Sequence, residues 1–134
     1  MKSHFMQVAG GRATIEMRDV PTPEPGPGQL LVRMRAASLN RGEFILGHGL
    51  HNAGAAKAIG MEGAGEVARA GAGVQAFGPG DRVMGRCPGA FSEYALMDAR
   101  EAIAMPPNLT WEEAASIPLT FLVVHDMLVA QGRL

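Results

Sequence analysis

The sequence predicts a mainly β domain that ends in short helices. Short apolar runs are separated throughout by glycine and proline, which occur 18 and 9 times, and this punctuation favours strands joined by turns. Sequence patterns typical of helices begin only near Asn108. The chain has 134 residues, of which 47% are hydrophobic, so it is long enough to form a single domain with a real core.

The first quarter of the chain predicts two strands separated by a proline-rich turn. We expect strands over 14–18 and 30–36, because the second alternates apolar and basic residues with a period of two. Proline donates no backbone hydrogen bond and cannot pair within a sheet. The tract of alternate prolines between the strands is therefore predicted to be a turn. A linker between domains is the alternative, but the tract is short for one. The prolines are Pro21, Pro23, Pro25 and Pro27.

The glycine-rich stretch over 60–83 permits two incompatible interpretations. Gly63, Gly65 and Ala68 have the spacing of a dinucleotide-binding fingerprint. That motif requires a helix directly after its glycines, and the residues that follow contain too much glycine and proline to form one. We therefore predict two strands joined by a loop, over 64–70 and 82–86.

Two helices are predicted at the C-terminal end. Thr110 and Glu113 have the spacing of a capping box, which predicts a short helix over 111–116. Pro118 suits the first turn of a second helix that runs to about residue 131, where Gly132 suits its end. The apolar residues of this helix occupy more than one face, which predicts burial from two sides. They are Leu119, Leu122, Val123, Met127 and Val129.

The stretch GMEGAGEV at 60–67, with GAGVQAFGPGDRV after it, resembles the medium-chain dehydrogenase/reductase superfamily, specifically its zinc-free quinone oxidoreductase branch. The resemblance implies a GroES-like, partly open β-barrel over 1–117 and a helix over 118–134 that leads toward a Rossmann domain. We expect this chain to lack that domain and therefore most of any nucleotide site. Further segments occur in the family's order at 19–33, 36–44, 89–97 and 106–121.

The same resemblance implies the function of the parent protein. Members of this branch transfer a hydride from NADPH to a quinone or enone in the cleft between the two domains. Asn40 matches the asparagine of the family's LN motif and is expected to be catalytic and to contact the cofactor, whereas its alternative role is to tie a turn together through its side chain. Glu43 is a second catalytic candidate, and a solvated loop acid is the alternative. Val123 stands where relatives carry a threonine that contacts the nicotinamide.

Apolar residues near these positions are candidates for a substrate pocket, although such residues more often belong to a core. They are Phe44, Leu46 and Met61. Glu62 is expected to be buried and to pair with Arg82 or Arg86 on the neighbouring strand.

No metal site is expected. The resemblance places Asn40 and Met61 where zinc-dependent members carry a cysteine and a histidine, and neither replacement ligates zinc well. Cys87 is the single cysteine, whereas the structural zinc lobe of those members needs four. His48 and His51 lie three residues apart but have no third donor nearby.

Charge and composition limit the partners. The net charge is −1, with 12 basic and 13 acidic residues, which gives no electrostatic reason to expect nucleic acid or an anionic membrane as a partner. No apolar run has the length of a signal peptide or a membrane helix. We expect a cytoplasmic protein with a small-molecule substrate, and self-association of the isolated chain through its C-terminal helix. A free-standing GroES-like interaction module and the enoyl reductase portion of a larger synthase remain alternatives.

Overall fold

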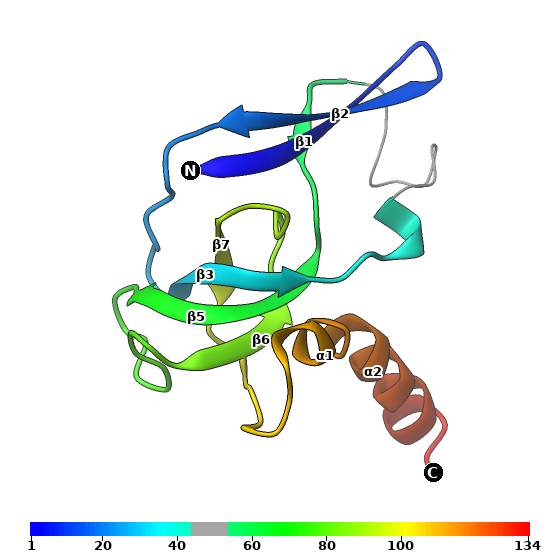
Figure 1. Ribbon diagram of the computed structural model, residues 1–134. Coiled ribbons are helices and arrows are strands. Elements are labelled where there is room, and N and C mark those ends of the chain that lie inside the picture. Colours follow the sequence, from blue (N-terminus) through cyan, green and yellow to red (C-terminus); the bar gives the residue numbers. More distant parts are fainter. Residues whose placement is uncertain (44–53) are drawn as a thin grey trace.

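The fold consists of two antiparallel sheets followed by a helical C-terminal arm (Figure 1). The computed structural model describes residues 1–43 and 54–134. The smaller sheet has the strand order β2-β1-β4. Gly10 and Gly11 connect its first two strands with φ values of 56° and 74°, as a two-residue turn of type I′ requires. The strands are β1 (Lys2–Ala9), β2 (Arg12–Asp19) and β4 (Lys57–Ala58).

The larger sheet has five strands in the order β7-β3-β5-β6-β8, and every pair is antiparallel. The two sheets do not close into one barrel, so the expected mainly β, partly open architecture is confirmed. A bridge between Ser3 and Ser92 joins the sheets locally. The strands are β3 (Gln29–Ala37), β5 (Glu62–Ala70), β6 (Arg82–Arg86), β7 (Tyr94–Asp98) and β8 (Ile103–Ala104).

The glycines of β5 allow its close approach to β3. A Cβ atom at Gly65 would lie 2.2 Å from the carbonyl oxygen of Arg33, and one at Gly63 would lie 2.5 Å from that of Ala36. No side chain fits at such distances, so these glycines are required by strand packing. The prediction of strands in place of a dinucleotide fingerprint is therefore confirmed.

Two apolar clusters form the core. One lies among β3, β5, β6 and β7, where Leu30, Val32, Val83 and Met97 are almost completely buried. The second lies where α1 (Trp111–Ala115) packs on the larger sheet, with Ala114 against Ala64 and its neighbours. Alternation along the strands places these side chains on the inner face.

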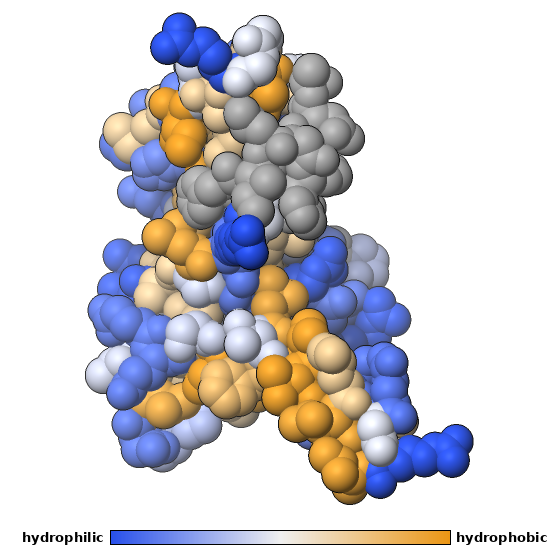
Figure 2. Space-filling view, turned by 90° about the vertical axis from the view of Figure 1, so that its right-hand side faces the viewer, coloured by the Kyte–Doolittle hydropathy of each residue, from blue (hydrophilic) through white to orange (hydrophobic). Residues whose placement is uncertain are grey.

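The C-terminal arm, which comprises residues 118–131, extends from the body of the molecule (Figure 1). Thr110 caps α1 in the predicted capping box, and Pro118 begins α2 (Pro118–His125). The predicted single helix to residue 131 is wrong in one respect, because its last six residues form the π-helix η2 (Asp126–Gln131). Figure 2 shows a continuous apolar surface along this arm. Apart from Pro118, which is buried, and Leu119, which is half-buried, the large apolar residues of α2 and η2 are 46–62% exposed. They are Phe121, Leu122, Val123, Val124, Met127, Leu128 and Val129.

Candidate functional site

A buried carboxylate joins three separate segments of the chain. Glu62 begins β5 and is 1% exposed. One carboxylate oxygen, Oε1, accepts hydrogen bonds from Ser38 Oγ at 2.5 Å and Asn40 Nδ2 at 2.9 Å. The other, Oε2, accepts from the backbone N–H of Leu119 at 2.6 Å. Glu62 therefore ties the segment after β3 to the first turn of α2, and hydrogen bonds of this kind offset the cost of burying the charge.

The expected arginine partners of Glu62 were wrong. Arg86 is its cross-strand neighbour, but the guanidinium is exposed and lies 3.4 Å from the carboxylate of Glu101. Arg82 donates to the carbonyl of Leu109 and lies over the Trp111 ring. Burying a guanidinium beside Glu62 would require its desolvation, whereas the three donors present are neutral.

Asn40 and Glu43 form a second set of hydrogen bonds next to Glu62. The backbone N–H of Asn40 donates to Glu43 Oε2 at 2.7 Å, and the N–H of Glu43 donates to the Asn40 carbonyl at 3.0 Å. These bonds close the 3-10 turn η1 (Arg41–Glu43). Glu43 is 2% exposed, so the alternative of a solvated loop acid is wrong. The backbone of Asn40 is fixed by Glu43, and its side-chain amide is held by Glu62.

Of the remaining predicted residues, Met61 and Val123 lie within the described part of the chain. Met61 is half-buried directly before Glu62, and its carbonyl accepts from the N–H of Cys87 at 2.9 Å. Val123 is 55% exposed on α2, one helical turn after Leu119. Phe44 and Leu46, together with the histidines at 48 and 51, lie outside the described residues. The structure thus brings Asn40 to Glu62 and Glu43 to Asn40. Met61 adjoins Glu62 in the chain, and Val123 lies one turn along α2 from Leu119.

Glu62 was interpreted from the sequence as a structural carboxylate, and its link to Asn40 was missed. The two residues are 22 positions apart, and no local pattern connects them. The available signal was Asn40 itself, four residues after the predicted strand over 30–36, whose partner β5 is found to begin at Glu62.

Cys87 is not prepared for metal or nucleophilic chemistry. Burial, followed by the negative charge of Glu62, raises the pKa of its thiol to about 12. The thiolate is the form that binds metals and attacks electrophiles. Among residues 1–43 and 54–134, no three His, Cys, Asp or Glu side chains come close enough together to hold a metal ion.

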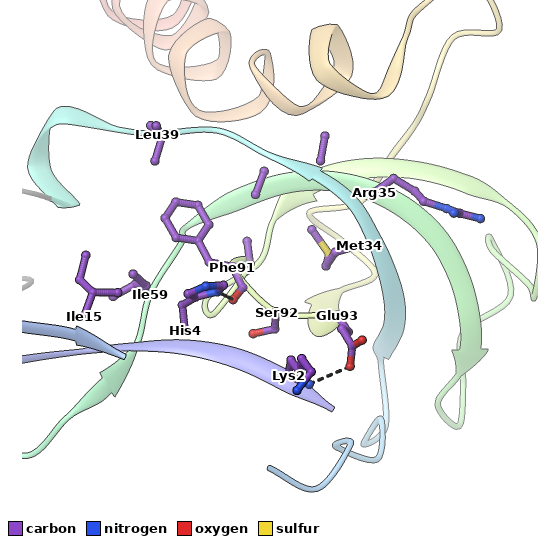
Figure 3. A pocket seen from close by; sticks show the side chains of 13 residues that line it. Lys2, His4, Ile15, Met34, Arg35, Leu39, Ile59, Phe91, Ser92 and Glu93 are labelled. Carbon is purple, nitrogen blue, oxygen red and sulfur yellow. Dashed lines mark hydrogen bonds between the residues drawn. The ribbon is translucent and has the colours of Figure 1, made fainter. Parts of the chain in front are cut away.

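A cavity of about 720 Å³ lies between the two sheets (Figure 3). Ala37 and Leu39 line it, whereas the alternate residues Ser38 and Asn40 bond to Glu62. The segment after β3 therefore separates an apolar cavity from a polar cluster. Polar groups that line the cavity have hydrogen-bond partners. The backbone N–H of Lys2 donates to Glu93 at 2.7 Å, and the ring of His4 bonds to the Phe91 carbonyl at 3.1 Å.

The helices within the described ranges are all too short or too polar to cross a membrane.

Comparison with known proteins gives consistent matches. The chain is 36% identical over 122 residues to the quinone oxidoreductase of Pseudomonas aeruginosa, which covers 89% of this chain and 38% of that protein. It is 42% identical over 101 residues to a component of the pikromycin polyketide synthase of Streptomyces venezuelae, covering 75% of this chain and 3% of that protein. The mycobacterial protein Rv1454c, solved in complex with NADPH, superposes with a TM-score of 0.85 at 30% identity, over 97% of this chain and 41% of that one.

The chain spans less than half the length of each of these proteins. Residues 26–107 match the family model described as the alcohol dehydrogenase GroES-like domain. The chain therefore belongs to the alcohol dehydrogenase GroES-like domain family, on the quinone oxidoreductase-like branch of the medium-chain dehydrogenase/reductase superfamily.

Proposed function

We propose that this chain is the substrate-side domain of a longer, zinc-independent NAD(P)H-dependent quinone or enone oxidoreductase, called the parent below. The observation that carries the proposal is the hydrogen-bonded set of Asn40, Glu43 and Glu62 at the first turn of α2. It places a fixed amide where the apolar surface of the C-terminal arm begins. A second domain seated on that surface would enclose a cleft beside Asn40.

The residues present fit a dinucleotide that is held mainly by another domain. When bound, NADPH would supply the hydride. Asn40 would orient the nicotinamide or the substrate through its amide, and the apolar side chain of Val123 would exclude water beside it. Excluding water and fixing polar groups in advance strengthens the electrostatic interactions within such a cleft.

Zinc independence is proposed from the chemistry of the side chains. Asn40 and Met61 are poor zinc ligands, and the Cys87 thiol stays protonated. The match to a quinone oxidoreductase of Pseudomonas aeruginosa supports a small electron-poor acceptor as the substrate. With a net charge of −1, neither nucleic acid nor an anionic membrane is proposed as a partner, and we propose a cytoplasmic location.

The second candidate is the enoyl reductase portion of a larger synthase. The 42% identity to a pikromycin polyketide synthase component specifically favours it. The reaction of such an enoyl reductase would differ from that of a quinone oxidoreductase mainly in the hydride acceptor, which would be an enone carried as a thioester. A free-standing interaction module is the third hypothesis, and the part-buried Asn40–Glu62 bond gives it no support. In the isolated chain, we propose that the exposed arm pairs with a second copy.

Hydride transfer by the parent tests the proposal. NADPH oxidation should depend on a quinone or enone acceptor and should survive dialysis against a chelator, whereas preference for a thioester enone would favour the synthase reading. The isolated chain should bind NADPH more weakly than a dissociation constant of about 100 μM, because the Rossmann unit would hold the phosphates. Absence of acceptor-dependent oxidation by a folded parent would refute the proposed activity.

A further inference from the structure

The Glu62–Asn40 bond fixes which end of the Asn40 amide is free. All three partners of Glu62 donate to it, namely Ser38 Oγ, Asn40 Nδ2 and the Leu119 N–H. An ionised carboxylate only accepts hydrogen bonds, so it selects the NH2 end of the amide and excludes the carbonyl end. The same Nδ2 lies 3.4 Å from Ser38 Oγ, which also places the NH2 group on this side.

The other end of the amide is an acceptor that has no donor among the described residues. Within the described part of the chain, no hydrogen bond reaches Asn40 Oδ1, and Asn40 is half-buried. The amide carbon separates Oδ1 from Nδ2, so Oδ1 faces away from Glu62. Rotating the amide by 180° would set Oδ1 against the Glu62 carboxylate, where two acceptors repel. The backbone bonds to Glu43 keep Asn40 from moving to relieve this.

We propose that Asn40 recognises its ligand as a hydrogen-bond acceptor, and that it takes the carboxamide NH2 of the nicotinamide and not the carbonyl oxygen of the substrate. A carbonyl oxygen placed at Oδ1 would find no donor there. A carboxamide NH2 supplies one. Glu62 is then a positioning residue that sets the polarity of the site through Asn40. The inference rests on the proposed function, because it assumes that a nicotinamide dinucleotide reaches Asn40.

The first experiment examines the Asn40 side-chain amide in this 134-residue chain. Asn40 side-chain NH2 resonances should show protection from exchange and a scalar coupling to the Glu62 carboxylate carbon. Glu62→Gln should remove both, because a glutamine can also donate to Oδ1 and allows the amide to turn. The matched control is Glu66→Gln on the same strand, which should leave them unchanged. An unprotected NH2 in the unaltered chain would overturn the inference without bearing on hydride transfer.

The second experiment measures how well the parent discriminates between two cofactors. NADPH is compared with its 3-acetylpyridine analogue, in which a methyl group replaces the carboxamide NH2. Loss of one neutral hydrogen bond predicts about three- to tenfold weaker binding of the analogue. Asn40→Ala and Glu62→Gln should both reduce that ratio toward one, whereas Glu66→Gln should keep it. A variant that merely unfolds part of the domain would weaken both dinucleotides alike.

The outcomes separate the two proposals. If the parent binds neither dinucleotide, the proposed function fails and the inference fails with it. If it binds and oxidises NADPH but the analogue binds equally well, the proposed function stands and the acceptor role of Asn40 is refuted.

Discussion

At the scale of single residues, the cluster around Glu62 shows why a buried charge can be retained. A carboxylate removed from water is costly unless donors replace its hydration. Here a hydroxyl, a side-chain amide and a backbone N–H do so. Each donor comes from a segment that the folded state must bring together, so the same bonds that stabilise the charge also specify the position of α2.

Replacing Glu62 by glutamine should therefore destabilise the chain. One end of the glutamine amide would be a donor facing donors, and a buried polar group without its partner costs about 1–3 kcal/mol. Glu66→Gln on the same strand is the control, because its ion pair with Arg35 is partly exposed and such pairs are worth about 0–1 kcal/mol. Urea denaturation measures both. Equal midpoints for the two variants would contradict the structural role of Glu62.

The Cys87 thiol should resist alkylation in the native chain. Its pKa is raised to about 12 from 9.0, chiefly by burial, so at pH 9 the native thiol remains protonated while an unfolded chain is half ionised. The thiolate is the reactive form. Because the folded pKa is the higher one, this group stabilises the fold fully below pH 9, and the contribution is lost as the pH rises toward 12. Iodoacetamide labelling at pH 9, with and without denaturant, checks this. Rapid labelling of the native chain would show an accessible thiol.

At the scale of elements, the pairing of β3 with β5 depends on glycine. These strands form the centre of the larger sheet, and their backbones approach closely at Gly63 and Gly65. The sequence predicted the strand and close packing around its glycines, but not which backbone they approach, because that is a property of the partner strand. The hairpin β1–β2 was only half predicted: its second strand was expected from the sequence, and its first strand was not.

Gly65→Ala should destabilise the sheet. The added Cβ would lie 2.2 Å from the Arg33 carbonyl oxygen, so the two strands must separate, and overpacking of this kind costs about 1–3 kcal/mol. The matched control is Gly78→Ala in the loop before β6, where a Cβ would meet nothing within 4 Å and φ is not left-handed. That variant should stay within about 0.5 kcal/mol of the original chain. Thermal unfolding compares the two, and a Gly65→Ala variant as stable as the control would exclude the close approach.

Local patterns predicted the terminal helices well and their environment poorly. Helix caps depend on residues only a few positions apart, so they could be predicted from the sequence. The capping box of Thr110 and Glu113 and the position of Pro118 at the start of α2 are both confirmed. The change to a π-helix at Asp126 has no local signal of this kind. The Glu62–Asn40 bond joins residues 22 positions apart, and only the register of β3 against β5 brings them together.

At the scale of the whole molecule, the exposed C-terminal arm is the feature that the rest of the fold does not explain. Apolar residues usually face a core or a partner. Here the apolar surface of α2 and η2 lies outside both core clusters, while Leu119 at its base is half-buried beside Glu62. The two-sided burial predicted from the sequence holds only at that base. In the parent, we propose that the cofactor domain covers the remainder.

The isolated chain should self-associate through this arm. Phe121, Val123 and Met127 are 55–62% exposed, and burying one such side chain is worth about 1.5–3 kcal/mol, so pairing two arms or exchanging them between copies would remove several from water. Introducing charge with Val123→Glu and Met127→Glu should shift the chain toward monomer in sedimentation velocity. Gln75→Glu, in the exposed glycine-rich loop, supplies a charge elsewhere and should leave the association unchanged. An unaltered chain that sediments as a monomer at high concentration would mean that the arm needs no second copy to cover it, because in solution it folds back onto its own sheets.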